Sequence, residues 1–159
     1  MKHKTLSAAS SRILSHFNDR DRHCFTIPEV KKVEPDRKDS TIRELLNNMV
    51  KRGLLLRLKN GLFYIVPFEQ DAKSFMPDWH LLSQYLVGDS GYYIGYFSAL
   101  QIHGLTTQPN LKEQIVVTKQ MNPSILKVKD IPFQFIYHNE KHFFGNKKIW
   151  IDGFNKVQC

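Results

Sequence analysis

Residues 39–66 read DSTIRELLNNMVKRGLLLRLKNGLFYIV, and this stretch decides the fold of the first part of the chain. Its first half carries apolar residues at the spacing of an amphipathic helix, with one face available for burial. These residues are Ile42, Leu45, Leu46, Met49 and Val50. The pattern therefore predicts a helix over residues 40–52.

Both ends of this predicted helix carry sequence signals. Asp39, Ser40 and Thr41 are candidate N-caps, because short polar side chains accept hydrogen bonds from the free N–H groups of a first turn. Gly53 suits the position just after the helix, since glycine readily adopts the left-handed conformation that ends many helices.

A β-hairpin is predicted directly after the helix. Residues 54–58 and 62–66 are apolar runs typical of strands. Asn60-Gly61 lies between them, and this dipeptide is a strong signal for a tight hairpin turn.

Two shorter helices are predicted upstream, over residues 5–18 and 25–33, the second with Thr26 as its N-cap and Pro28 early in the helix. Three helices followed by a two-stranded hairpin is the order of a winged helix-turn-helix. We therefore expect residues 1–70 to form a DNA-binding domain of this class.

The remainder, residues 71–159, is expected to be a small α+β domain that follows a linker at 69–77. Helices are expected near 79–86 and over 97–103, and Gly104 suits the end of the second. Strands are expected at 92–94, 114–118, 131–137 and 148–151. The fold class predicted for the whole chain is α+β.

The charge is concentrated in the first part. The chain has a formal net charge of +8, and residues 1–70 hold 14 Lys+Arg against 8 Asp+Glu, a net +6. Residues 71–159 hold 9 against 7, a net +2, and all the arginines lie before residue 70. A basic first domain favours a polyanionic partner such as duplex DNA.

The second helix of a helix-turn-helix enters the major groove, so the polar face of residues 40–52 is the predicted DNA contact. That face comprises Ser40, Thr41, Arg43, Glu44, Asn47, Asn48 and Lys51. Arginine pairs with guanine, and asparagine with adenine. The alternative is the solvated face of a structural helix.

Arg57, Lys59 and Asn60 lie at the tip and flank of the predicted hairpin, where they are a second candidate DNA contact. The alternative is a charged device that blocks pairing at a strand edge.

No enzyme is predicted, and neither a cofactor nor a metal is expected. His138 and His142 have a metal-ligand spacing, and so do the neighbours His23 and Cys24, but neither pair brings further ligands in a recognisable pattern. Two distant cysteines and no apolar run long enough to span a membrane indicate a cytoplasmic protein.

The second part supports a different class of function, a module that binds only protein or RNA. Its dense aromatic group comprises Tyr92, Tyr93, Tyr96 and Phe97. Most of this group is expected in the core, and the rest could form a contact or base-stacking surface.

The sequence resembles the AbiE-type antitoxins, the regulatory half of type IV toxin–antitoxin systems. The matching stretches span roughly residues 5–145. In the first part they are Phe25-Thr26, 45–56 and 61–67, and in the second Tyr92-Tyr93-Ile94-Gly95, Ser98-Ala99-Leu100, His103-Gly104-Leu105 and Phe143-Phe144-Gly145.

This resemblance implies an N-terminal domain that represses its own promoter, where an inverted repeat is the expected target. It also implies a C-terminal region that neutralises a nucleotidyltransferase-like toxin without a stable complex. Members of the family usually continue beyond the Phe-Phe-Gly stretch into a helical segment, whereas this sequence stops at Cys159. We therefore expect either a fragment or a natural short form.

Overall fold

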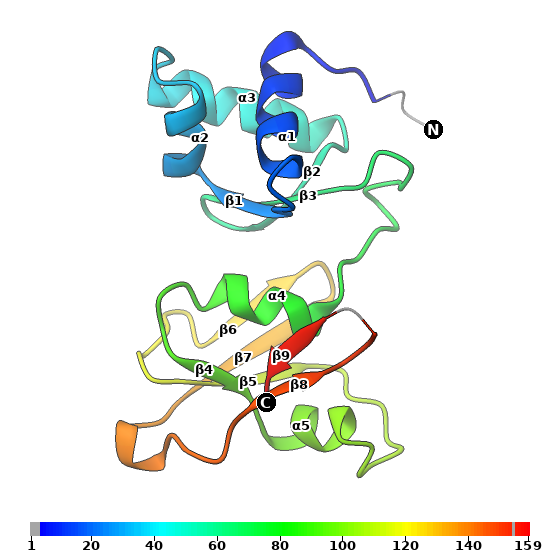
Figure 1. The fold of residues 1–159 in the computed structure, drawn as a ribbon, viewed down its shortest axis with the longest axis vertical. Coiled ribbons are helices and arrows are strands. Elements are labelled where there is room, and N and C mark those ends of the chain that lie inside the picture. Colours follow the sequence, from blue (N-terminus) through cyan, green and yellow to red (C-terminus); the bar gives the residue numbers. More distant parts are fainter. Residues whose placement is uncertain (1–3, 154) are drawn as a thin grey trace. The chain divides into compact units, whose positions relative to one another are not determined.

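A computed structural model describes residues 4–153 and 155–159 of the chain. The protein is a mixed α+β structure, and its described residues form five α-helices and three small sheets (Figure 1). The chain divides into two compact units, Met1–Met76 and Pro77–Cys159, and helices dominate the first while strands dominate the second.

The first unit has three helices, α1 (Ala8–Asn18), α2 (Ile27–Val33) and α3 (Asp39–Lys51). The backbone N–H of Thr26 donates to the Glu29 carboxylate at 2.7 Å. A negatively charged side chain therefore caps the start of α2, where the helix dipole favours negative charge. Helix α3 begins one residue earlier than the sequence predicts. Lys38 is its N-cap and has no side-chain capping bond, so none of the three predicted caps takes that position.

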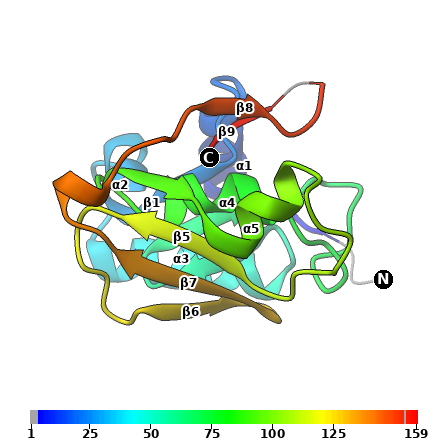
Figure 2. The same ribbon diagram turned by 90° about the horizontal axis from the view of Figure 1, so that it is seen from below.

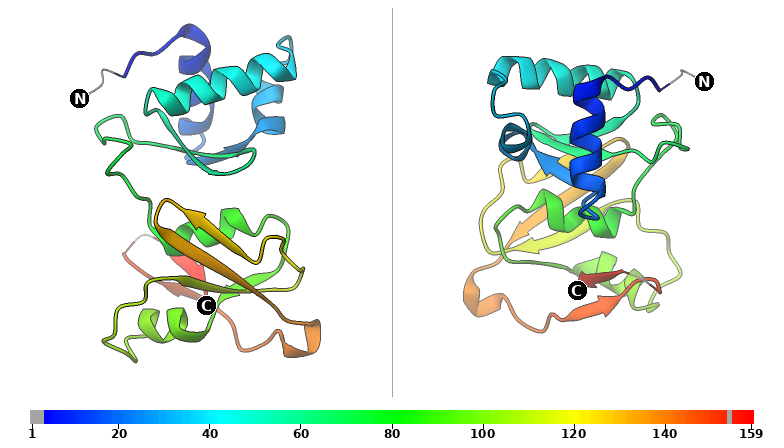
Figure 3. Two further views of the ribbon diagram at one scale, coloured as in Figure 1. Left: turned by 180° about the vertical axis from the view of Figure 1, so that it is seen from behind. Right: turned by 45° about the horizontal axis from the view of Figure 1, so that its top comes forward.

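A three-stranded antiparallel sheet lies beside these helices (Figures 1 and 3). Its strands are β1 (Cys24–Thr26), β2 (Leu55–Lys59) and β3 (Leu62–Ile65), in the order β1-β3-β2. Gly61 has a φ of +78°, which allows the tight turn between β2 and β3. Phe25, which the sequence predicts in the second helix, lies outside it because it pairs with Phe63 in this sheet, but Thr26 is the N-cap of α2 as predicted.

The core of the first unit joins the helices to the sheet through stacked aromatic rings. Phe17 of α1 stacks on Phe25 of β1 with centroids 4.5 Å apart, and Phe25 stacks on Phe63 of β3 at 6.0 Å. Ile42, Leu46 and Met49 of α3 are fully buried in the same cluster. This packing fixes which face of α3 is left for solvent.

The second unit is built on a four-stranded sheet in the order β4-β5-β7-β6. Its strands are β4 (Tyr92–Ile94), β5 (Glu113–Val117), β6 (Ile125–Val128) and β7 (Ile131–Tyr137). Strands β5 and β7 are parallel, and the other pairs are antiparallel. Figure 2 shows β5, β7 and β6 of this sheet side by side.

Two helices flank this sheet, α4 (Trp79–Leu86) on one side and α5 (Tyr96–Ile102) on the other (Figure 1). A short 3-10 turn, η1 (Glu140–His142), precedes a separate antiparallel pair, β8 (Lys148–Trp150) and β9 (Lys156–Gln158). The sequence pattern does not predict β6 or β9. Strand β6 is an edge strand whose exposed side carries the apolar Ile125, so its sequence lacks the alternation of polar and apolar residues that marks a half-buried strand.

Candidate nucleic-acid interface

Helix α3 presents a continuous polar face. The predicted apolar residues lie on the opposite side, with Ile42, Leu46 and Met49 buried and Leu45 and Val50 partly buried. Six of the seven predicted contact residues are exposed and the seventh, Asn48, is half-buried. The exposed six are Ser40, Thr41, Arg43, Glu44, Asn47 and Lys51. The structure therefore brings this predicted set together on one surface.

The hairpin adds its own cations beside this face. Arg57 of β2 is exposed and donates a hydrogen bond from its guanidinium to the side-chain Oδ1 of Asn47 on α3. Its guanidinium also lies over the Phe63 ring, 5.6 Å from the centroid. Asn60 at the turn is exposed, while Lys59 next to it is half-buried. The Arg57–Asn47 bond thus connects the hairpin to the polar face of α3.

An ionic network fixes the turn between α2 and α3. The buried carboxylate of Glu34 accepts from Arg12 of α1 at 2.7 Å and from Arg37 at 2.7 Å. Hydrogen bonds from Arg12 and Arg37 lower the pKa of Glu34 to about 2. Because Glu34 immediately follows α2, this network sets where the chain turns toward α3.

Replacing Glu34 by glutamine is expected to lower the free energy of unfolding of the first unit by about 1–2 kcal/mol at pH 7. This value is smaller than the pKa shift alone implies, because solvent screens the partly exposed arginines. The ordinary carboxyl pKa is 4.5 and the folded pKa is about 2, so the stabilisation is complete above pH 4.5 and falls as the pH drops toward 2. Chemical denaturation of the wild type and Glu34→Gln between pH 2 and pH 7 measures this difference.

Glu44→Gln is the matched control, because Glu44 is exposed and makes no ion pair with the described residues. Its free energy of unfolding should follow the wild type within about 0.5 kcal/mol over the same pH range. A Glu34→Gln deficit that persists unchanged at pH 2 would contradict an electrostatic origin.

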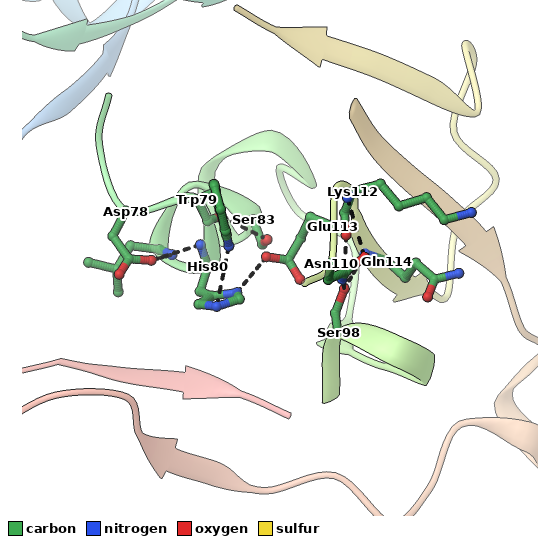
Figure 4. Close-up of polar contacts among 10 residues, drawn as sticks. Asp78, Trp79, His80, Ser83, Ser98, Asn110, Lys112, Glu113 and Gln114 are labelled. Carbon is green, nitrogen blue, oxygen red and sulfur yellow. Dashed lines mark hydrogen bonds and ion pairs between the residues drawn. The ribbon is translucent and has the colours of Figure 1, made fainter. Parts of the chain in front are cut away.

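A second polar cluster lies inside the second unit, where α4 meets β5 (Figure 4). Glu113 is fully buried, and its Oε2 lies 2.5 Å from Nδ1 of His80. The indole N–H of Trp79 donates to Nε2 of His80 at 3.3 Å, so Nε2 is an acceptor and Nδ1 carries the proton. His80 thus bridges Trp79 on its own helix and Glu113 on β5.

Ser98 of α5 is the centre of the neighbouring bonds in Figure 4. Its Oγ accepts from the Gln114 backbone N–H at 2.9 Å and from Nδ2 of Asn110 at 2.7 Å, and it donates to the Lys112 carbonyl at 3.3 Å. A hydroxyl has one donor and two acceptor sites, so its capacity is fully used. The buried Ser98 therefore holds α5 and the loop that follows it against β5.

The aromatic group of the second unit is divided between core and surface. Tyr92, Tyr93 and Phe97 are partly buried, whereas Tyr96 is 48% exposed and has a φ of +53°. Its hydroxyl lies 2.9 Å from Nε2 of His138.

Nδ1 of His138 lies 3.2 Å from the carbonyl of His142, and a carbonyl only accepts, so Nδ1 carries the proton. His138 therefore has both ring nitrogens engaged without a metal. In the part of the chain that the structure describes, no group of three or more His, Cys, Asp or Glu residues could hold a metal ion.

The other two candidate metal ligands, His23 and Cys24, are adjacent in sequence but differ in exposure. Cys24 is buried in β1, and burial raises the pKa of its thiol to about 12. His23 is half exposed and lies 3.7 Å from the carboxylate of Asp21. Among residues 4–153 and 155–159, no helix is both long and apolar enough to cross a lipid bilayer.

No protein-family model matches the sequence, and no curated protein matches it. Among solved structures, the chain is similar to the crystal structure of the RV2827C protein from Mycobacterium tuberculosis, with a TM-score of 0.64 and 15% sequence identity. The match covers 89% of this chain and 49% of that one, so this chain spans about half the length of its structural relative. At this identity the likeness concerns the fold alone.

Proposed function

We propose that the first unit is a winged helix-turn-helix and that the protein binds duplex DNA in a sequence-specific manner to regulate transcription. The observation that carries this proposal is the exposed polar face of α3, bonded through Asn47 to Arg57 of the β2–β3 hairpin. In this reading α3 is the recognition helix in the major groove and the hairpin is the wing.

Electrostatics supports the same assignment. Residues 1–70 hold a net +6 and all the arginines, which suits contacts to phosphates and to guanine. The contact residues of the proposal are the seven on the polar face of α3 together with Arg57, Lys59 and Asn60. We propose neither a catalytic activity nor a cofactor for this protein.

The resemblance to AbiE-type antitoxins supports a more specific role, an autorepressor that binds an inverted repeat in its own promoter. In that role the second unit would neutralise a nucleotidyltransferase-like toxin without forming a stable complex. The Ser98-Ala99-Leu100 run of the resemblance includes the hydroxyl that holds α5 against β5.

The second candidate function is a protein- or RNA-interaction module centred on the second unit. The exposed Tyr96 favours it, because a bulky residue with a positive φ is strained and such strain gathers at functional positions.

Selection from a library of random duplexes tests the proposal directly. The full chain should enrich a defined sequence and bind it at least about 10³-fold more tightly than an unrelated duplex. Equal binding to all duplexes, or a preference for single-stranded RNA, would favour the interaction module instead. Co-expression with the adjacent nucleotidyltransferase-like gene, where one exists, tests the antitoxin role by growth rescue.

Lys59→Ala should weaken binding to every duplex by a similar factor, because a wing lysine contacts phosphate rather than a base edge. The slope of log affinity against log salt should fall in magnitude by about one, which is the share of one phosphate. Lys127→Ala is the control, since Lys127 is an exposed lysine on β6 of the second unit. If the salt slopes of wild type and Lys59→Ala coincide, the hairpin does not lie on the DNA.

A further inference from the structure

The hydrogen bond between Arg57 and Asn47 has a fixed direction. A guanidinium has only donors, so the Asn47 atom that faces Arg57 must be the carbonyl oxygen Oδ1. The amide Nδ2, with its two N–H donors, is consequently turned away from Arg57. Both residues are exposed, so these donors face solvent on the polar side of α3.

Arg57 is held in this position by a second contact. It pairs directly with Phe63 across the β2–β3 ladder, and its guanidinium lies over the Phe63 ring. Phe63 is buried and stacked on Phe25, so the ring that supports the guanidinium belongs to the core. A cation over an aromatic face is stabilised by the ring quadrupole.

The usual asparagine contact to DNA requires a free Oδ1. Asparagine reads adenine by accepting from the N6 amino group through Oδ1 and donating from Nδ2 to N7. In this protein Oδ1 already accepts from Arg57. The oxygen has a second lone pair, but an adenine amino group that used it would bring its N–H donors against the positive guanidinium.

We infer that Arg57 and Asn47 form a donor-only pair that selects guanine over adenine at the base pair it meets in the major groove. Guanine presents two acceptors there, O6 and N7, which match the free N–H groups of Asn47 and Arg57. This inference rests on the proposed function, and it replaces the adenine contact that the sequence predicts for Asn47. Arg57 then acts in specificity as well as in binding phosphate.

The test is a selection of random duplexes with the full-length wild type and three variants. Wild type should prefer guanine over adenine by about 10-fold at one position of its site. Arg57→Leu frees Oδ1 and should reverse that preference toward adenine. Asn47→Asp keeps the acceptor for Arg57 but removes both amide donors, so it should lose the guanine preference.

Arg52→Leu is the matched control, because Arg52 is an exposed arginine just after α3 and its removal leaves the Arg57–Asn47 bond in place. It should keep the guanine preference with weaker overall binding. Circular dichroism and thermal melting confirm that each variant is folded, as expected for exposed positions.

The possible failures are distinguishable. A folded wild type that selects no duplex at low salt would overturn the proposed function and this inference together. A wild type that selects a defined sequence, but whose profile is unchanged in both Arg57→Leu and Asn47→Asp, would overturn the inference alone. An independent check uses the free protein, where Arg57→Leu should shift the NMR signals of the Asn47 side-chain amide.

Discussion

Arg43→Ala is expected to weaken binding to the selected duplex by about 5- to 150-fold, which corresponds to about 1–3 kcal/mol for a lost base contact. Arg43 is exposed on the polar face in the N-terminal half of α3, and its guanidinium makes no ion pair with the described residues. Its donors are therefore available to a guanine edge. Fluorescence anisotropy with the selected duplex and with one unrelated duplex measures the effect.

The two duplexes separate base reading from phosphate contact. Loss of a base contact should lower affinity for the selected duplex far more than for the unrelated one. Arg20→Ala is the control, because Arg20 is an exposed arginine in the turn after α1 and donates to the carbonyl of His16, so it belongs to neither α3 nor the hairpin. If Arg43→Ala and Arg20→Ala bind the selected duplex equally well, α3 is not the recognition helix.

Ser98→Ala is expected to lower the free energy of unfolding of the second unit by about 2–4 kcal/mol. The substitution leaves the Gln114 N–H and the Asn110 amide without their acceptor. An unsatisfied buried donor costs about 1–3 kcal/mol, and the cost at Asn110 lies at the low end because this residue is only half-buried. The loss should appear in urea denaturation followed by tryptophan fluorescence, since Trp79 and Trp150 both lie in the second unit.

Ser124→Ala provides the comparison for Ser98→Ala. Ser124 is an exposed serine in the same unit, so its replacement should change the free energy of unfolding by less than about 0.5 kcal/mol. A similar small effect at Ser98 would mean that water satisfies the two donors and that the hydroxyl does not hold α5. Because the chain forms two compact units, the affinity of folded Ser98→Ala for duplex DNA should stay within about 2-fold of wild type.

The sequence predicts the elements that carry the candidate site more closely than the elements that support it. The α3 pattern and the Asn60-Gly61 turn placed a helix and a hairpin within one or two residues of their positions. Strand β1 was missed because three residues carry no periodicity of their own. Cys24–Thr26 becomes a strand only by pairing with β3, which lies almost forty residues later.

The polar networks of the second unit were beyond prediction for a similar reason. Nothing in the local sequence distinguishes Ser98 from other serines, and its partners lie 12 to 16 residues away. His80 and Glu113 are 33 residues apart and meet only when α4 packs on β5.

What the sequence determined by itself was therefore local: the amphipathic period of α3, the hairpin after it and the uneven distribution of charge. These features depend on neighbouring residues, so they can be read without the fold. The tertiary structure alone decided which donors and acceptors remain free. The residue type of Asn47 suggested pairing with adenine, whereas the β2–β3 hairpin places the Arg57 guanidinium against its Oδ1, a contact between residues ten positions apart that no local pattern predicts.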